Sequence, residues 1–185
     1  MFLLCGLGNP GKKFINTRHN IGFKLADNII DYFDFTKVKV GKTKEIYTGK
    51  INSHKILLLK PLTFMNLSGK SVSETINFYK LKSENVFVFH DDLDLKLAKI
   101  KIKKGGGNGG HNGLSSIDNY IGKEYFRIRI GIDHPGNKNQ VSKYVLSNFL
   151  KGEQKIIKNK LNKITINFNL IFTDVPLFLT KIVEK

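Results

Sequence analysis

The sequence predicts a single α/β domain over residues 1–185, a three-layer fold in which helices flank a mixed, twisted, mostly parallel central sheet. Three observations support this class. Short apolar stretches of strand length alternate with stretches of helical periodicity, which is typical of α/β proteins. Two strand-like stretches are separated only by Asn52-Ser53-His54, which indicates a hairpin and therefore some antiparallel pairing. The chain has the length of one domain and holds no repeat or low-complexity linker.

The amino-terminal half predicts a strand, a helix, a hairpin and a second helix. An apolar run that ends at glycines is typical of a buried strand, whereas apolar residues three or four positions apart are typical of a helix packed on one face. Ile21, Leu25 and Ile29 have that helical spacing, as do Val72 and Ile76. The expected elements are a strand at 2–7, a helix at 21–34, strands at 45–51 and 55–60, and a helix at 68–81.

The carboxyl-terminal half continues the alternation. The apolar run VFVFH and the alternating stretches LAKIKIKK and FRIRIGI predict three further strands. The expected elements are strands at 86–90, 98–103 and 126–132, a helix that opens near Ser115, two helices at about 139–149 and 152–170, and a looser tail.

The charge of the chain indicates a polyanionic partner. The sequence has 31 Lys and Arg against 15 Asp and Glu, a formal net charge of +16 at pH 7. Such an excess is typical of proteins that bind RNA, DNA or an anionic membrane. A biased composition is the alternative, because the chain is also rich in Asn, Ile and Phe. What decides between them is whether the charge is ordered along the chain.

Composition excludes several other classes. A content of 41% hydrophobic and 25% charged residues is that of a globular protein rather than a disordered one. No uncharged apolar run reaches the about 18 residues of a spanning helix, and the start MFLLCGLGNPG has neither a basic leader nor a cleavage pattern. A single cysteine, Cys5, excludes an intramolecular disulfide and a cysteine-based metal cluster. We therefore expect a soluble, cytoplasmic protein.

Two strands carry ordered positive charge. Lys99, Lys101 and Lys103 alternate with isoleucines in one, and Arg127 and Arg129 alternate with apolar residues in the other. Because side chains alternate between the two faces of a strand, each strand should bury one face and present a cationic one. If the two strands are neighbours, these charges form a patch of the size that binds phosphate. The alternative is an ordinary solvated face.

Two glycine-rich loops resemble nucleotide-binding motifs, but the residues around them are not those that such motifs require. GLGNPG matches G-x-G-x-x-G, but Pro10-Gly11 interrupts it and the helical pattern begins about ten residues later, so no dinucleotide site is expected. In GGGNGGHNG, His111 and Asn112 stand where a P-loop needs Lys and Ser or Thr. Its glycines let backbone N–H groups approach an anion or a carbonyl closely, whereas a floppy linker is the alternative.

Histidine acting on water is the chemistry that the residues favour. The histidines lack the helical spacing of metal ligands, so we expect no metal. A G-x-S-x-G nucleophile motif is absent, and Cys5, inside a strand, is expected to be a small buried residue. His19 lies in the run NTRHN between a glycine loop and a helix, where catalytic groups are commonly displayed.

Acidic and amide side chains follow the predicted strands. Asp91, Asp92 and Asp94 lie at the carboxyl end of the strand VFVFH, the functional edge of α/β sheets. A carboxylate that accepts the Nδ1 proton of His19 would fix the imidazole tautomer and raise its basicity. Amides in loops suit reading a peptide or holding an oxyanion, although each is also a common turn residue. The loop asparagines at strand ends are Asn9, Asn66 and Asn112.

Five blocks of the sequence, in this order and spacing, resemble the bacterial peptidyl-tRNA hydrolase family: GLGNPGKKFINTRHNIGF, PLTFMNLSG, HDDLDL, GGGNGGHNGLSSI and FRIRIGIDHPG. The similarity runs from about Leu3 to Phe149. It implies a monomeric α/β fold with a mixed twisted sheet and no cofactor. The implied reaction is hydrolysis of the ester that joins a peptide to the 3′ ribose of tRNA, which frees the tRNA for reuse in translation. The implied partner is peptidyl-tRNA, at its acceptor stem and 3′ end, with no membrane.

The resemblance also implies roles for individual residues. His19 corresponds to the catalytic base, Asp91 to the carboxylate that orients it, and Asn9 to the residue that discriminates blocked from free aminoacyl groups. Lys103 and Arg129 correspond to basic positions that grip the 5′ phosphate of the tRNA. The positions that contact tRNA or peptide, or line the cleft beside them, are Phe14, Phe64, Met65, Asn66, His111 and Asn112. The chain departs from the family pattern at Phe14, where tyrosine is usual, and at Asp92, where glutamate is common.

Two other function classes compete with this one. A non-catalytic RNA-binding module would account for the charge and the glycine loops, but not for a histidine and a carboxylate at two strand ends. A nucleoside- or phosphate-handling enzyme of similar architecture would need a preformed phosphate loop. Release of peptide from N-blocked aminoacyl-tRNA, with free aminoacyl-tRNA as the control, separates the three classes.

Overall fold

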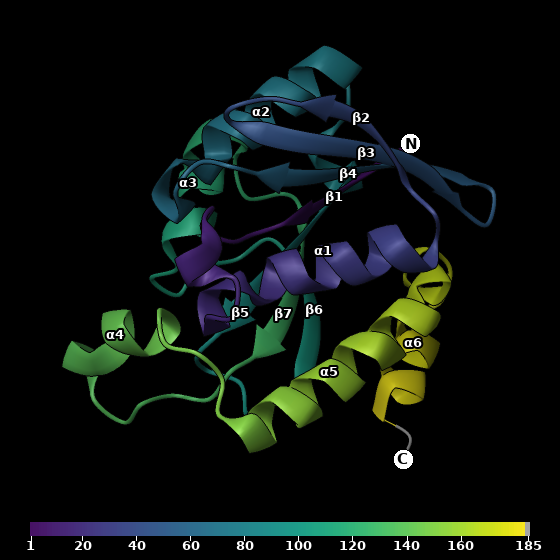
Figure 1. The fold of residues 1–185 in the computed structure, drawn as a ribbon. Coiled ribbons are helices and arrows are strands. Elements are labelled where there is room, and N and C mark those ends of the chain that lie inside the picture. Colours follow the sequence, from purple (N-terminus) through teal and green to yellow (C-terminus); the bar gives the residue numbers. More distant parts are fainter. Residues whose placement is uncertain (184–185) are drawn as a thin grey trace.

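The computed structural model describes residues 1–183, and its centre is a seven-stranded sheet between two layers of helices (Figure 1). The strands are β1 (Phe2–Gly6), β2 (Thr36–Val40), β3 (Lys44–Ile51), β4 (His54–Pro61), β5 (Val86–Asp92), β6 (Ile100–Lys104) and β7 (Phe126–Gly131). Their order across the sheet is β2-β3-β4-β1-β5-β7-β6. The sheet twists, so that β3 and β7 run in clearly different directions in Figure 1. Within the described residues, no helix is long and apolar enough to cross a membrane.

The sheet is mixed, which confirms the prediction. The central strands β4, β1, β5 and β7 pair in parallel, whereas β3 runs antiparallel to β4, β2 antiparallel to β3, and β6 antiparallel to β7. Because parallel strands end at the same edge, the loops that follow β1, β4 and β5 meet there. That edge of an α/β sheet is where ligands commonly bind.

Two apolar layers hold the helices on the sheet. On one face lie α1 (Ile21–Tyr32), α5 (Lys151–Ile166) and α6 (Val175–Val183), and on the other α2 (Ser68–Tyr79) and α3 (Asn112–Ile121) (Figure 1). The side chains of β1 alternate between the layers: Leu4 packs with residues of α1, α5 and α6, while Leu3 and Cys5 pack with residues of α2 and α3. A short helix, α4 (Val141–Val145), has no buried residue and stands apart from both layers.

The structure corrects several predicted elements. Strand β2 escapes prediction because all five of its residues are exposed at the sheet edge, so burial leaves no apolar pattern. The tail expected to be loose contains α6, whose Phe178 and Ile182, four residues apart, are both buried. The helix expected at 139–149 is reduced to α4 and a 3₁₀ turn at Lys138–Gln140, and Phe149 alone among residues 139–149 is buried.

A close approach between α1 and the sheet sets the position of the preceding turn. A Cβ on Gly22 would lie 2.3 Å from the Phe89 carbonyl oxygen and 2.6 Å from the Leu7 amide nitrogen, so only glycine fits there. The first turn of α1 therefore touches the ends of both β1 and β5. This contact brings the 3₁₀ turn Arg18–Asn20 to the carboxyl edge of the sheet.

Replacing Gly22 by Ala should be strongly destabilising. The added methyl group meets backbone atoms that cannot yield, and overpacking of this kind costs about 1–3 kcal/mol. Equilibrium urea unfolding measures the change. Gly152→Ala is the matched control, because Gly152 lies in α5 and a Cβ added there would meet no atom within 4 Å, so the variant should be neutral or more stable. Equal stability of the two variants would contradict the close approach.

Candidate active site

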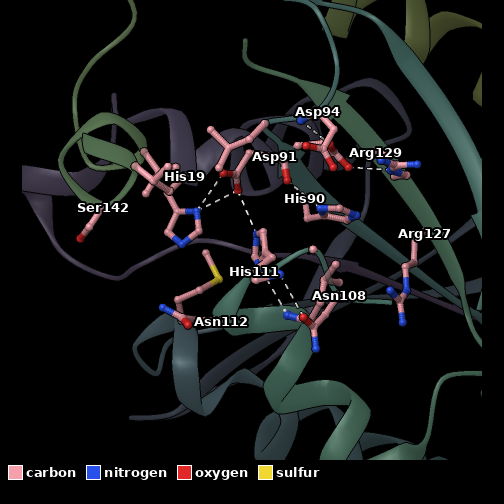
Figure 2. A pocket seen from close by; sticks show the side chains of 18 of the residues that line it. His19, His90, Asp91, Asp94, Asn108, His111, Asn112, Arg127, Arg129 and Ser142 are labelled. Carbon is pink, nitrogen blue, oxygen red and sulfur yellow. Dashed lines mark hydrogen bonds and ion pairs between the residues drawn. The ribbon is translucent and has the colours of Figure 1, made fainter. Parts of the chain in front are cut away.

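A cavity of about 900 Å³ opens at the carboxyl edge of the sheet. Its walls come from the loops after β1, β4 and β5, the turn Arg18–Asn20, the glycine-rich loop before α3, and α4 (Figure 2). All eleven site residues expected from the sequence line it: Asn9, Phe14, His19, Phe64, Met65, Asn66, Asp91, Lys103, His111, Asn112 and Arg129. The topology thus brings together residues that are far apart in the sequence.

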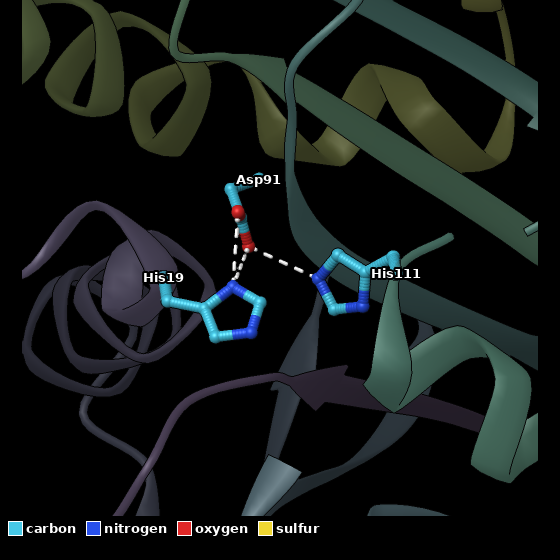
Figure 3. A group of neighbouring side chains, drawn as sticks. All are labelled: His19, Asp91 and His111. Atoms are coloured by element: carbon cyan, nitrogen blue, oxygen red, sulfur yellow. Dashed lines mark hydrogen bonds and ion pairs between the residues drawn. The ribbon is translucent and has the colours of Figure 1, made fainter. Parts of the chain in front are cut away.

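At the base of the cavity, the carboxylate of Asp91 lies between two imidazole rings (Figure 3). His19 Nδ1 is 2.8 Å from Asp91 Oδ1 and 3.0 Å from Oδ2, and His111 Nε2 is 3.0 Å from Oδ1. Asp91 and His19 are 3% and 7% exposed, so water competes little for these contacts. Each imidazole comes from a different element, the 3₁₀ turn and the amino terminus of α3.

The hydrogen bonds assign the proton positions on both rings. His111 Nδ1 accepts from the backbone N–H groups of Gly113 and Leu114, at 3.1 and 3.3 Å, and so caps α3. Its proton is therefore on Nε2, from which it donates to Asp91. His19 donates to the same carboxylate through Nδ1. The other nitrogen of His19, Nε2, points away from Asp91 with its lone pair available (Figure 3).

Asp91 stays ionised in this environment. Burial by itself would raise the pKa of its carboxyl group, but the two imidazoles beside it hold that pKa well below its usual range. A permanently charged acceptor between the rings keeps both N–H groups directed at it. The arrangement has the form of a base oriented by a carboxylate, with a second histidine that fixes the carboxylate.

Asn9 is held so that the Nδ2 group of its side-chain amide, a hydrogen-bond donor, faces the cavity. Its Oδ1 accepts from the Met65 backbone N–H at 2.9 Å. Asn20, the last residue of the 3₁₀ turn, accepts from the Asn9 N–H at 2.8 Å and donates to the Asn9 carbonyl at 2.9 Å. With Oδ1 occupied, the Nδ2 group of Asn9 is left to donate to a ligand. Asn66 and Asn112 are exposed on other walls of the same cavity.

An aromatic pair forms part of the rim. The rings of Phe14 and Phe64 meet edge to face with centroids 6.5 Å apart. Phe64 is 57% exposed, which is unusual for so large an apolar side chain. Phe14 lacks the hydroxyl of tyrosine, so it offers a ring face and no hydrogen bond. Met65, beside them, is buried.

The cationic patch is smaller than the alternating sequence predicted. Strands β6 and β7 are indeed neighbours, with Lys101 opposite Arg129 and Lys103 opposite Arg127. Arg127, however, is 2% exposed, because α3 and the glycine loop cover it. Its guanidinium donates to the Gly107 carbonyl at 2.7 Å and to Asp118 at 2.8 Å. The expectation that Arg127 belongs to an exposed cationic face is therefore wrong.

Arg129 and Lys103 both line the cavity, and Arg129 lies at its end away from His19 (Figure 2). Arg129 Nε is 2.6 Å from Asp92 Oδ2, and the arginine keeps about a quarter of its side chain exposed. A Cβ on Gly106 would come within 2.6 Å of the Lys103 ammonium, so that side chain lies across the glycine loop. The two acids thus have separate partners: Asp91 contacts the histidines and Asp92 contacts Arg129.

His19, Asp91 and His111 also form the kind of group that can hold a metal ion, with one ligand atom each within 4.8 Å of the others. The hydrogen bonds already account for every one of these contacts. To ligate a metal through the nitrogens that face Asp91, both imidazoles would lose those protons. The geometry is therefore that of two histidines hydrogen-bonded to one carboxylate.

Sequence reasoning missed the parts played by two neighbours of His19 and by His111. Arg18 and Asn20 are 4% and 3% exposed and connect the turn to other walls of the cavity. The available signal was five consecutive polar residues, Asn16 to Asn20, directly before a helix. The capping by His111 depends on its place at the start of α3, which the sequence pattern puts three residues too late.

Comparisons with known proteins agree with one another. A family model described as peptidyl-tRNA hydrolase matches residues 3–184. The peptidyl-tRNA hydrolase of Rickettsia bellii (strain RML369-C) is 52% identical over 172 residues, covering 92% of this chain and 93% of the relative. That of Ehrlichia ruminantium (strain Welgevonden) is 45% identical over 183 residues, covering 98% and 94%. The crystal structure of peptidyl-tRNA hydrolase from Acinetobacter baumannii superposes with a TM-score of 0.92 at 38% identity, covering 98% and 94%.

Replacing His90 by Gln should remove a pH dependence of stability. Burial lowers the pKa of His90 from 6.5 to about 3, so the unfolded chain binds the extra proton first as the pH falls. The wild type should therefore lose about 2 kcal/mol more stability than the variant between about pH 7 and about pH 5. Gln can still donate to the Asp91 carbonyl, which His90 contacts at 2.7 Å. Urea unfolding at both pH values measures the losses, and equal losses would refute this assignment.

Proposed function

The chain belongs to the peptidyl-tRNA hydrolase family, and from this premise we propose that His19, Asp91 and Asn9 carry the reaction. The reaction is hydrolysis of the ester between a peptide, or an N-blocked amino acid, and the 3′ ribose of tRNA. The observation that supports these roles best is the His19–Asp91 hydrogen bond, which leaves His19 Nε2 free beside a large cavity. An oriented imidazole with a free lone pair is a general base for water.

The chemistry follows from that geometry. Water bound at His19 Nε2 gives its proton to the imidazole as its oxygen attacks the ester carbonyl. Asp91 stabilises the imidazolium, and Asn9 Nδ2 donates to the oxyanion that forms. The tetrahedral intermediate then breaks its bond to the ribose oxygen, which takes the proton from His19. The products are tRNA with a 3′ hydroxyl group and the carboxylic acid of the peptide, which releases its proton to water to become a carboxylate.

The other lining residues recognise the two parts of the substrate. The amides of Asn66 and Asn112 suit the backbone of the peptide, and the exposed ring of Phe64, with Phe14, suits stacking on the 3′ end of the tRNA. Met65 provides an apolar wall, and His111 holds Asp91 in place. Lys103 and Arg129 would bind the 5′ phosphate at the end of the acceptor stem, since guanidinium and ammonium groups are the usual phosphate partners.

We also propose that residues 1–185 act as one domain, as a monomer, in the cytoplasm, where peptidyl-tRNA is made. Support for one domain comes from α6, whose Phe178 packs in the same apolar cluster as Leu4 of β1. The proposed reaction needs no cofactor, no metal and no membrane, because the base is an imidazole and the nucleophile is water.

Replacing His19 by Ala should lower kcat strongly and leave substrate binding nearly unchanged. Loss of a general base typically costs about 10²–10⁴-fold in kcat. Hydrolysis of N-blocked aminoacyl-tRNA measures kcat, and binding of the same RNA with an amide-linked, uncleavable aminoacyl group measures affinity. Free aminoacyl-tRNA, hydrolysed by neither protein, is the substrate control. An unchanged kcat in the variant would remove His19 from the mechanism.

Replacing Lys103 or Arg129 by Ala should raise KM and flatten its salt dependence. Each lost phosphate contact lowers the slope of log affinity against log salt by about 0.9 for a duplex. Lys55→Ala is the matched control, because Lys55 is an exposed lysine at the start of β4, on the opposite edge of the sheet. If Lys103→Ala and Arg129→Ala match Lys55→Ala at low and high salt, the patch is only a solvated face.

A further inference from the structure

The side chain next to the catalytic histidine points to a different part of the cleft. We propose that Arg18 is a positioning residue, which fixes the wall formed by residues 141–149 to the turn that carries His19. These residues, here termed the roof segment, comprise α4 and the four residues after it. The inference rests on the proposed function and extends it to a residue with no contact to the substrate.

Arg18 and the roof segment are joined by several contacts. The Arg18 backbone N–H donates to the Ser147 carbonyl at 3.0 Å. Its guanidinium donates to Ser147 Oγ at 2.8 Å and to the Asn148 carbonyl at 2.5 Å. It also lies over the rings of Tyr144 and Phe149, 4.3 and 5.1 Å from their centroids. The side chain is 5% exposed, so these contacts act with little competition from water.

An acidic residue completes the arrangement around Arg18. Arg18 Nη2 is 2.6 Å from Glu153 Oε2, and the same oxygen accepts from the Leu150 backbone N–H at 2.7 Å. Glu153 thus caps α5 and pairs with Arg18 at once. A lysine could supply the charge, but only a planar guanidinium can reach Glu153, Ser147 and Asn148 together while stacking on the rings.

Helix α4 depends on few anchors besides Arg18, whereas Phe149, at the other end of the roof segment, is buried in the apolar core. Helix α4 has no buried residue, and its other polar anchor is the Tyr144 hydroxyl, which donates to the Ile132 carbonyl at 2.6 Å. Four residues of the segment nevertheless line the cavity, and Ser142 flanks the His19 side (Figure 2). They are Val141, Ser142, Val145 and Leu146. A short exposed helix with so few anchors moves easily when one is lost.

The physical consequence is a loss of substrate binding rather than of chemistry. His19 keeps its orientation through Asp91 when Arg18 is changed, so the base survives. The roof segment contacts the substrate equally before and during reaction, and loosening it weakens both states alike. Such a change raises KM and leaves kcat nearly constant.

The test compares Arg18→Met with a variant of a second buried, ion-paired cation. Lys44→Met is the matched control, because Lys44 is 8% exposed and pairs with Glu74 at 2.6 Å, outside the cavity. Kinetics with N-blocked aminoacyl-tRNA should show a KM raised about ten-fold for Arg18→Met, with kcat and its acid pH limb within about two-fold of wild type. Arg18→Lys should recover part of the loss, and Lys44→Met should show wild-type KM.

Two further measurements keep the result decisive. Tyr144→Phe loosens the other anchor and should also raise KM; combined with Arg18→Met, it should be less than additive. Amide hydrogen exchange of residues 141–148 should accelerate in Arg18→Met but not in Lys44→Met, whether or not the chain hydrolyses any substrate. If Arg18→Met does not fold, Arg18→Lys and Tyr144→Phe carry the same comparison.

Three outcomes would overturn the inference. Wild-type KM together with unchanged exchange in Arg18→Met would make Arg18 a purely structural residue. A shifted pH limb of kcat would mean that Arg18 acts directly on His19. Accelerated exchange with unchanged KM would mean that the roof segment does not contribute to substrate binding. Failure of the wild type to hydrolyse the substrate would instead refute the proposed function, and the exchange result would stand apart from it.

Discussion

A buried charge organises this molecule. The Asp91 carboxylate is almost completely removed from water, and it is tolerated there only because two imidazole N–H groups replace the lost hydration. One imidazole comes from the turn before α1 and the other from the residue directly before α3, so the carboxylate joins the two helical layers at the edge of the sheet. By capping α3 through Nδ1, His111 is fixed in the tautomer that carries its proton on Nε2, so both of its nitrogens are occupied. Of the two rings, His19 is therefore the one with a free nitrogen on the cavity side.

The packing of the backbone brings the residues around Asp91 together. Parallel pairing of β1 and β5 puts Asn9 and Asp91 on one edge, and the absence of a side chain at Gly22 lets α1 approach closely enough for His19 to reach Asp91. The three residues of the turn from Arg18 to Asn20 each contact a different part of the cavity. Arg18 holds the roof segment, His19 contacts Asp91, and Asn20 fixes the loop of Asn9. Three consecutive residues therefore fix the positions of three walls of the cavity.

Local patterns predicted what depends on neighbours in the sequence and missed what depends on distant ones. Apolar runs and loop positions sufficed for the central strands and for placing His19 and Asp91 at one edge. Alternation in FRIRIGI put Arg127 and Arg129 on the same face but could not show that α3 covers Arg127. Helix α6 was missed because Phe178 and Ile182 are buried in an apolar cluster whose other members come from the whole length of the chain. The residues that Arg18 contacts in the roof segment lie about 130 positions further along the chain, so no local sequence pattern indicates these contacts.

Asp91 and the cap of α3 together set the tautomers of the two histidines. Nitrogen-15 NMR of the imidazole side chains at about pH 8, where an ordinary imidazole is neutral, measures the tautomers directly. We predict that His19 carries its proton on Nδ1 with a bare Nε2, and that His111 carries its proton on Nε2 with a bare Nδ1. A His19 ring protonated on Nε2 would have no base on the cavity side, and that result would contradict the assignment of His19 as the general base.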